Sequence, residues 1–292
     1  MSWLEIKRRI GELRAVRDAG GPMKEPWAAF VEAVRSTQDT PPYHLRGILA
    51  ALKDAQGGRP AAEMVILDHG CSGGNTLLYL LALGYRGIYG VDIGGKDPQW
   101  NMLLQEEFGI CEPRFFLYDG ETLPLKDASV DFIFSQQVLE HVHPSVFERY
   151  YAEEGRVLKV GGAAFHQVPH RLVPYDSHTR TWLIHYFPPG TRERLYSLLG
   201  RDPRYVEGML YLRMPSCHRT QLIKYIGTAK DVTLDRLVSL KELEYYDGPK
   251  MLRRMMGAVV RLPLIGRAIG QTLKWFVMLE TVSVKTGLAS QS

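Results

Sequence analysis

Short apolar runs alternate with helix-forming stretches along residues 60–170. The run 65–67 is apolar at every position, as expected for a buried strand, and residues 76–83 are mostly strong helix formers. Further strands are expected at 87–93, 114–120, about 131–135 and about 163–168. Strands that alternate with helices in this way predict the α/β class, a mostly parallel sheet with helices on both faces.

Helical patterns flank this alternating region on both sides. Apolar residues recur at helical spacing from Trp3 to Leu13, which predicts a first helix that ends near Val16. The other stretches with a recognisable pattern are helices at about 26–35, 43–55, 191–199 and 220–226, a mixed segment at 232–244 and a final strand at 276–285.

We expect these elements to form four parts. The parts are an N-terminal helical cap (1–58), an α/β core that binds the cofactor (59–190), a helical cover region (191–275) and a final strand with its tail (276–292).

A glycine-rich turn from Gly70 to Gly74 follows the first strand and the carboxylate of Asp68. A turn between a strand and a helix presents backbone N–H groups and a helix N-terminus to a ligand. The glycines depart from the dinucleotide pattern Gly-x-Gly-x-x-Gly, because Ser72 occupies the position of the second alternating glycine. Asp68 would repel a pyrophosphate but would accept hydrogen bonds from an amino-acid ammonium group. The turn therefore favours S-adenosylmethionine (SAM) over a dinucleotide.

Two more carboxylates follow later strands of the series. Asp92 ends the second strand, 24 residues after Asp68, and is placed to hydrogen-bond both ribose hydroxyls. Asp119 ends the third strand and would accept a hydrogen bond from the adenine amino group. Any one of these residues alone is typical of an ordinary turn at a strand end. Three in succession indicate a nucleoside-binding edge of the sheet.

These motifs resemble those of class I SAM-dependent methyltransferases of the small-molecule, methyltransferase type 11-like group. The resemblance rests on the segments 67–74, 138–142 and 154–162 together with Asp92 and the Asp119-Gly120 pair, and it is close over roughly residues 60–170. It implies a Rossmann-like fold with seven strands, in which N-terminal helices cover the substrate mouth or cap the sheet edge and a helical insertion precedes the last, antiparallel strand. It also implies that the chain is an enzyme whose cofactor is SAM. The cofactor-binding residues that it implies are Asp68, Gly70, Cys71, Ser72, Gly74, Asp92, Ile93, Asp119, Gly120, Ser135 and Gln136.

The acceptor side of the site is expected in the segment 169–189, a proline-rich structured loop after the fifth strand. Ligands of open α/β sheets lie outside the carboxyl ends of the strands, where this loop must be. Its histidines, arginines and aromatic residues suit a hydroxylated acceptor such as a carbohydrate, a glycolipid or another small molecule. Alternatively, these residues hydrogen-bond the loop to itself.

A hydroxyl acceptor needs a base that takes its proton, and histidine titrates in the useful range. We expect His141 in this role, with His170 and His178 as the other candidates. Each of the three is also open to a structural interpretation. The sequence predicts no metal site, because no histidine pair has ligand spacing on a clear helix.

Charge and cysteine content limit the partners. The formal net charge is +4; residues 1–24 carry six basic and three acidic residues, and residues 249–292 carry seven basic residues and one acidic residue. Basic ends on an acidic body are not typical of a nucleic-acid-binding protein. The basic, apolar segment 251–275 either touches an anionic membrane surface or packs on its own domain. Three widely spaced cysteines indicate a reducing compartment, and the absence of a signal peptide or a spanning segment predicts a cytoplasmic protein.

The sequence is also compatible with other functions. A scaffold that binds SAM without catalysis, or C- or N-methylation of a small metabolite, would fit the same motifs. A nucleotide-sugar dehydrogenase or epimerase is discarded. It needs a tyrosine and a lysine four residues apart on one helix, and Gly248-Pro249 interrupts Tyr246 and Lys250.

Overall fold

The structure is a computed structural model that divides into two compact units. The first unit comprises Met1–Ser135 with Arg156–Ala163, and the second comprises Gln136–Gly155 with Ala164–Ser292. The structure describes residues 3–39, 41–94, 100–202, 208–239, 255, 257–263 and 265–287. The pair Tyr246 and Lys250 and much of the segment 232–254 lie outside the described residues.

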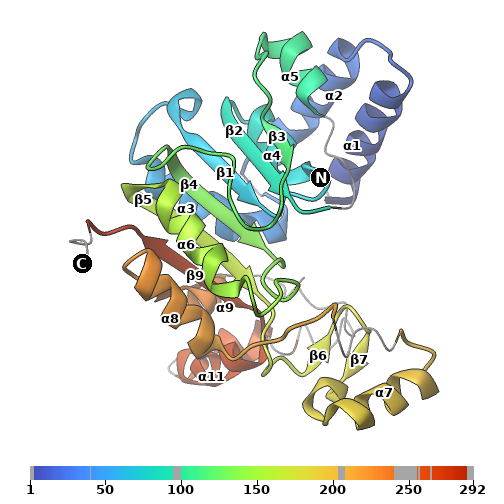
Figure 1. Cartoon of the computed structure of the whole chain (residues 1–292), viewed down its shortest axis with the longest axis vertical. Helices are drawn as coiled ribbons and strands as arrows, with labels where there is room; N and C mark the ends of the chain where they lie inside the picture. The colour runs from blue at the N-terminus through green and yellow to red at the C-terminus, as the bar shows by residue number, and fades with distance from the viewer. Residues whose placement is uncertain are drawn as a thin grey trace. The chain divides into compact units, whose positions relative to one another are not determined.

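The main sheet has seven strands in the order β3-β2-β1-β4-β5-β9-β8 (Figure 1). β1 runs parallel to both β2 and β4, and β2 runs parallel to β3. The strands are β1 (Val65–His69), β2 (Gly87–Asp92), β3 (Phe115–Leu117), β4 (Val130–Gln136), β5 (Leu158–Val168), β8 (Lys230–Asp231) and β9 (Leu279–Val284). The expected strand in the C-terminal tail is present as β9, and it pairs antiparallel with β8. The predicted α/β class with a mostly parallel sheet is confirmed.

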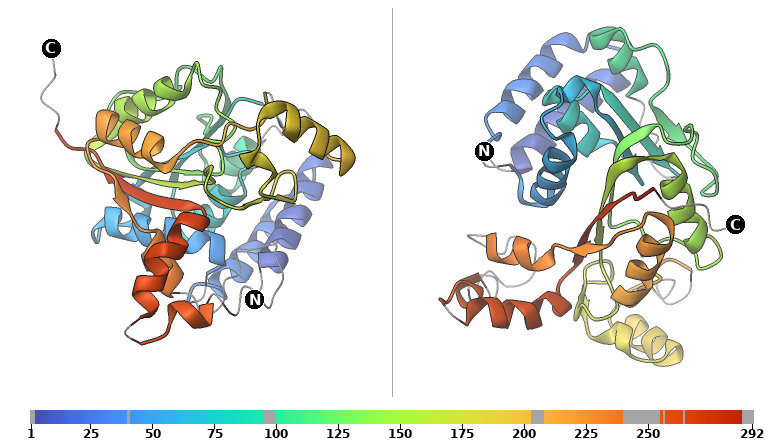
Figure 2. Two further views of the ribbon diagram at one scale, coloured as in Figure 1. Left: turned by 90° about the horizontal axis from the view of Figure 1, so that it is seen from below. Right: turned by 90° about the vertical axis from the view of Figure 1, so that its left-hand side faces the viewer.

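Helices of the first unit include three that precede the sheet and two that connect its strands. They are α1 (Trp3–Asp18), α2 (Lys24–Arg35), α3 (Tyr43–Gln56), α4 (Asn75–Ala82) and α5 (Asn101–Phe108). α1 packs on α2, and α2 also contacts α4, so the N-terminal helices belong to the same unit as the glycine-rich turn (Figures 1 and 2).

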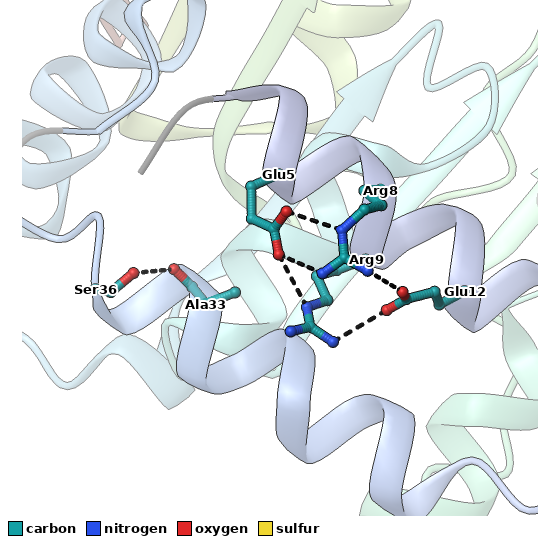
Figure 3. Close-up of polar contacts among 6 residues, drawn as sticks. All are labelled: Glu5, Arg8, Arg9, Glu12, Ala33 and Ser36. Carbon is teal, nitrogen blue, oxygen red and sulfur yellow. Dashed lines mark hydrogen bonds and ion pairs between the residues drawn. The ribbon is translucent and has the colours of Figure 1, made fainter.

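The face of α1 that points to solvent carries a network of ion pairs (Figure 3). Glu5 pairs with Arg8 at 2.5 Å and with Arg9 at 3.2 Å, and Glu12 pairs with both arginines. Charges three and four residues apart on a helix support it by a few tenths of a kcal/mol per pair. The opposite face, with Ile6, Ile10 and Leu13, is fully buried.

α4 begins directly after the glycine-rich turn and is almost completely enclosed. Residues 77–81 of this helix are each at most 1% exposed. A helix that is apolar on all sides must be buried. This burial holds the turn that precedes the helix against the sheet.

The second unit adds a small hairpin and several helices to its strands. The hairpin joins β6 (Tyr175–Asp176) to β7 (Thr181–Trp182) in antiparallel register, and α9 packs on α11 (Figure 1). The helices are α6 (Phe147–Val157), which ends in the first unit, α7 (Pro189–Leu198), α8 (Pro215–Tyr225), α9 (Thr233–Ser239) and α11 (Gly266–Leu273). No helix in the described part of the chain has both the length and the apolar composition needed to cross a bilayer.

Several predicted bounds were wrong. β5 begins at Leu158, five residues before the predicted start, and includes Gly161 and Gly162; Gly161 has a φ of 79°, which glycine adopts without strain, and the strand continues through it. α8 begins at Pro215, because proline suits the first turn of a helix. The segment 169–189 contains the β6–β7 hairpin and is not purely a loop.

Candidate active site

Hydrogen bonds to β2 hold the glycine-rich turn after β1. The backbone N–H groups of Gly70 and Cys71 both donate to the carbonyl oxygen of Val91, each at 2.9 Å. Gly70, Ser72 and Gly74 have φ values of 95°, 46° and 71°, which lie in the left-handed region. Glycine adopts this region without strain, and Ser72 adopts it at a cost. The turn is therefore a fixed and partly strained loop in front of α4.

Space around the turn is limited on its inner side. A Cβ atom on Gly74 would lie 2.9 Å from atoms of both Trp100 and Phe115, so position 74 requires glycine. The carbonyl oxygen of Gly73 accepts hydrogen bonds from the Trp100 indole at 2.9 Å and from Arg14 at 3.2 Å. Arg14 also donates to the side chain of Asn75 at 2.5 Å. α1 thus supports the turn, although no local signal in the sequence assigns Arg14 or Trp100 to it.

Asp68 places a carboxyl group beside this turn. The residue is 5% exposed, and burial together with the neighbouring Asp92 carboxylate raises its pKa well above the ordinary value. A buried acid of this kind gains stability when a cation approaches it. The ammonium group of an amino acid supplies that charge, so the position fits the methionine end of SAM.

Asp92 links the end of β2 to the turn. One carboxylate oxygen accepts the backbone N–H of Ser72 at 2.7 Å, and the other accepts the N–H of Gly94 at 3.2 Å. Two residues of the predicted cofactor site, Ser72 and Asp92, are therefore in direct contact. The sequence places them 20 positions apart.

Asp119 and Gly120 follow β3. The Asp119 carboxylate accepts the backbone N–H groups of Glu121 and Thr122 at 2.8 and 2.9 Å, which fixes the loop. Gly120 has a φ of 79°, and a Cβ atom there would lie 3.1 Å from the Ile93 side chain. Ile93 itself is 68% exposed. An exposed apolar side chain against a glycine offers a surface on which a flat base packs.

Ser135 and Gln136 end β4. In the register with β1, Asp68 lies opposite Phe134, so Ser135 occupies the next position along the neighbouring strand. Ser135 is 1% exposed and is the last residue of this stretch of the first unit, whereas Gln136 is the first residue of the second unit.

Two of the three predicted histidines lie together in the second unit. The rings of His141 and His178 are perpendicular, with centroids 4.9 Å apart. His141 Nδ1 hydrogen-bonds the carbonyl oxygen of Met209 at 2.7 Å, and His178 Nδ1 hydrogen-bonds Asp176 at 3.1 Å.

The surroundings of these side chains shift their pKa values in different directions. The bond to Asp176 raises the pKa of His178, while burial lowers the pKa of His141. Glu140, which sequence reasoning did not select, lies beside them; burial raises its pKa to about 8.

His170 lies elsewhere and has a different environment. It is 2% exposed, its Nε2 donates to the carbonyl oxygen of Val277 at 2.9 Å, and its Nδ1 faces the backbone N–H of Leu172 at 3.3 Å. Burial lowers the pKa of His170 to about 4. With both nitrogens engaged, this imidazole ties a loop to the chain before β9.

Comparison with known proteins gives one matching family model and several similar solved structures. The model of a family described as a methyltransferase domain matches residues 67–166. A methyltransferase solved with the Haloferax volcanii activator Trm112 is 16% identical, with a TM-score of 0.44, over 91% of this chain and 98% of that chain. The YcgJ protein of Bacillus subtilis is 17% identical, with a TM-score of 0.46, over 82% of this chain and 99% of its own.

A further solved structure is geranyl diphosphate C-methyltransferase from Streptomyces coelicolor. It is 13% identical to this chain, with a TM-score of 0.47, over 89% of this chain and 82% of that one. The matched segment 67–166 begins in β1, contains the glycine-rich turn with Asp92 and Asp119, and ends in β5. The part of the chain that contains these motifs, residues 67–166, thus matches the model of a methyltransferase domain family.

Proposed function

We propose that this enzyme transfers the methyl group of SAM to a hydroxyl of a small acceptor, such as a carbohydrate or a glycolipid. The observation that supports SAM as the methyl donor is the buried Asp68 carboxyl beside a glycine-rich turn that Asp92 contacts. The observation that supports a hydroxyl acceptor is the pair of imidazoles at His141 and His178, each with its Nδ1 in a hydrogen bond.

Each cofactor-side residue has a proposed role in this arrangement. Asp68 would hold the ammonium group, and the backbone of Gly70, Cys71, Ser72 and Gly74 would enclose the methionine portion. Asp92 would bind the ribose hydroxyls, while Asp119, Gly120 and Ile93 would contact the adenine, with Ser135 and Gln136 closing the site. When bound, the sulfonium supplies an already activated methyl group, so the protein mainly aligns the acceptor and excludes water.

The acceptor loses its hydroxyl proton as it attacks. An imidazole whose Nδ1–H is held by a carbonyl or a carboxylate keeps its Nε2 lone pair available as a base. His141 and His178 each have Nδ1 in such a bond, with His178 Nε2 3.7 Å from Glu140, whereas His170 uses both nitrogens in structural bonds. We therefore place the proton acceptor at His141 or His178.

The test combines binding and turnover. Calorimetry should show that the protein binds SAM and ignores NAD, and incubation with labelled SAM and fractionated cell extract should label a hydroxylated product. His141→Ala should keep its affinity for SAM and lose about 10²–10⁴ in kcat. His143→Ala is the matched control, because this exposed histidine bonds Ser145 and should turn over normally.

Three results would contradict parts of the proposal. No SAM binding would remove the cofactor assignment, and a label on carbon or nitrogen would replace the hydroxyl acceptor. SAM binding without transfer to any fraction would favour a scaffold that lacks catalysis.

We also propose that the segment 251–275 contacts an anionic membrane surface, where a lipid-linked acceptor would be found. Of this segment, residues 251–254, 256 and 264 lie outside the described part of the chain. Among the others, Leu262, Ile265 and Trp275 are exposed by 45–55%; Arg261 directly precedes Leu262, and Arg267 lies between Ile265 and Trp275 in the chain. Exposed apolar side chains interspersed with arginines favour an interfacial segment.

A further inference from the structure

Three side chains with metal-binding atoms meet in the second unit. Glu140, His141 and His178 each offer one such atom, and these atoms all lie within 4.8 Å of one another. The turn after β4 supplies the first two residues, and the segment that joins β6 to β7 supplies the third. The fold alone brings them together, since His178 is distant from the other two in the chain.

His178 is oriented as a metal-ligating histidine would be. Its Nδ1 hydrogen-bonds Asp176 Oδ1 at 3.1 Å, and the same oxygen accepts its backbone N–H at 3.0 Å. The second oxygen of Asp176 accepts the Thr179 hydroxyl at 2.7 Å. A carboxylate fixed in this way orients the imidazole and favours the tautomer with the proton on Nδ1.

His141 has an equivalent arrangement with a backbone partner. Its Nδ1 lies 2.7 Å from the carbonyl oxygen of Met209, which can only accept, so the proton is on Nδ1. Nε2 is therefore the lone-pair nitrogen. Both imidazoles thus have the tautomer that a metal ion requires, and each has an outer partner that sets it.

The buried carboxyl group of Glu140 lacks the hydrogen-bond partner that each of the two histidines has. Its side chain is fully buried, and no other described residue donates a hydrogen bond to either carboxyl oxygen, so that only its own backbone N–H is close enough to interact. His178 Nε2 lies 3.7 Å from one of these oxygens, which is too long for a hydrogen bond. A buried carboxyl without hydrogen bonds is costly unless an ion completes its environment.

The turn that carries Glu140 and His141 is held rigidly. Arg213 donates to the carbonyl oxygens of Leu139 at 2.7 Å and Val142 at 2.6 Å, and its guanidinium lies 3.8 Å from the Phe147 ring centroid. The Glu140 carbonyl oxygen accepts the backbone N–H of Tyr211 at 2.6 Å. The backbone of these two residues is therefore held in place by its neighbours.

We propose that Glu140, His141 and His178 bind one divalent transition-metal ion of the Zn²⁺ type. Two imidazoles and one carboxylate suit Zn²⁺ and similar ions, whereas Mg²⁺ and Ca²⁺ prefer oxygen ligands. Ligand atoms around a tetrahedral Zn²⁺ lie about 3.3 Å apart, because each bond is about 2 Å long. Three protein ligands leave a position open for water or for an oxygen of a ligand, and the exposed His141 borders solvent.

This metal site does not depend on the proposed methyl transfer, but it affects the assignment of the proton acceptor. While an ion is bound, His141 Nε2 and His178 Nε2 are ligands and cannot accept a proton. SAM binding by the first unit is measured separately, so failure of either proposal is distinguishable from failure of the other.

The test is a calorimetric titration of metal-free protein with Zn²⁺, with Mg²⁺ as the comparison and with the visible absorption of Co²⁺ as a second readout. We expect one Zn²⁺ per chain, a rise in Tm on binding and no response to Mg²⁺. His178→Ala should weaken Zn²⁺ binding at least about 100-fold, and Asp176→Asn by about 10–100-fold. His143→Ala should bind like the unchanged protein.

Glu140→Gln provides a second variant of nearly the same volume in case an alanine variant fails to fold. It should fold, keep its affinity for SAM and bind Zn²⁺ more weakly. An unchanged Zn²⁺ affinity in both His178→Ala and Glu140→Gln would overturn the proposal, as would the absence of Zn²⁺ binding by the unchanged protein. In the latter case, the cluster would be a hydrogen-bonded and ion-paired structural group.

Discussion

At the residue scale, Asp68 determines how cofactor binding responds to pH. In the free protein its pKa is raised well above the ordinary value by burial and by Asp92, so its carboxyl keeps a proton to higher pH than an exposed aspartate does. The SAM ammonium group would favour the ionised carboxylate and lower this pKa in the complex. We therefore predict that SAM affinity rises with pH until the free carboxyl is ionised, and that binding below that point releases a proton.

Calorimetry in two buffers with different ionisation enthalpies measures this proton release. Asp68→Asn should bind SAM more weakly by about tenfold or more, because a charged hydrogen bond contributes about 1.5–3 kcal/mol. The variant should also lose the rise of affinity with pH. Equal proton release by the variant and the unchanged protein would assign the effect to another group.

A second residue-scale prediction concerns Gly74, where shape matters more than charge. Gly74→Ala would combine a φ of 71° with a Cβ atom 2.9 Å from Trp100 and Phe115. Left-handed strain and overpacking each cost about 1–3 kcal/mol, so both the free energy of unfolding and SAM affinity should fall. Gly57→Ala isolates the strain, since Gly57 has a φ of 56° and nothing within 4 Å of its Cβ position. Urea unfolding of both variants should show the larger loss at position 74.

At the element scale, Asp131 joins β4 to its neighbours at the start of the strand. Its carboxylate accepts the Val65 backbone N–H at 2.9 Å, and it pairs with Arg59 at 2.9 Å and Lys159 at 3.0 Å. These hydrogen bonds outweigh burial and lower the pKa of Asp131. Because the folded pKa is below the unfolded value of about 3.9, the stabilisation is complete above that pH and is lost as pH falls through the folded pKa.

Asp131→Asn should lower the free energy of unfolding at pH 7 by about 1–2 kcal/mol, since both cationic partners are partly exposed. The difference between variant and unchanged protein should shrink as the pH falls below about 4. Asp127→Asn is the control, because the exposed pair with Arg156 should contribute little. Thermal unfolding at pH 7 and pH 3 checks both variants. An effect that stays constant with pH would exclude the ion pairs as its source.

The sequence predicted the elements best where hydrophobic pattern and turn chemistry agree. The β1–turn–α4 unit follows from the apolar run 65–67 and the glycines after it, because both signals are local. The start of β5 was misplaced, because Gly161 and Gly162 are typical of turns. In the structure, a Cβ atom on Gly162 would lie 3.0 Å from the carbonyl oxygen of Asp131, so close strand packing requires this glycine. Packing of this kind is not visible in a single segment.

In the candidate site, too, the sequence predicts the residues with a local signal and misses those that tertiary contacts bring in. Asp68, Asp92 and Asp119 could be selected because each ends a predicted strand. Arg14 and Trp100 could not be selected, since they lie 59 residues before and 27 residues after Gly73 and reach it only in the folded chain. The meeting of Glu140 with His178 likewise depends on chain topology, and the sequence criterion of regular helical spacing misses it.

At the scale of the whole molecule, the two units have different chemistry. The first contains the turn, Asp68 and Asp92, which are suited to a cationic nucleoside such as SAM. The second contains the cluster of Glu140, His141 and His178, which is suited to a metal ion or to a proton of the acceptor. Substitutions of Asp68 or Asp92 should therefore change SAM affinity, and those in the cluster should change kcat or metal binding while SAM affinity is kept.

The uneven charge of the chain, with a basic C-terminal segment at 251–275, predicts that the protein binds anionic vesicles. On the proposed membrane contact, the exposed Leu262, Ile265 and Trp275 would enter the interface and Arg261 and Arg267 would meet anionic headgroups. Each basic residue near such a surface contributes about 1 kcal/mol, so the Arg261→Glu/Arg267→Glu double variant should bind anionic vesicles at least about tenfold more weakly. Arg194→Glu, an exposed position on α7, controls for net charge. Flotation with phosphatidylserine vesicles should retain the unchanged protein at low salt and release it at high salt. Equal retention of both variants, or none of the unchanged protein at low salt, would mean that this segment only covers its own domain.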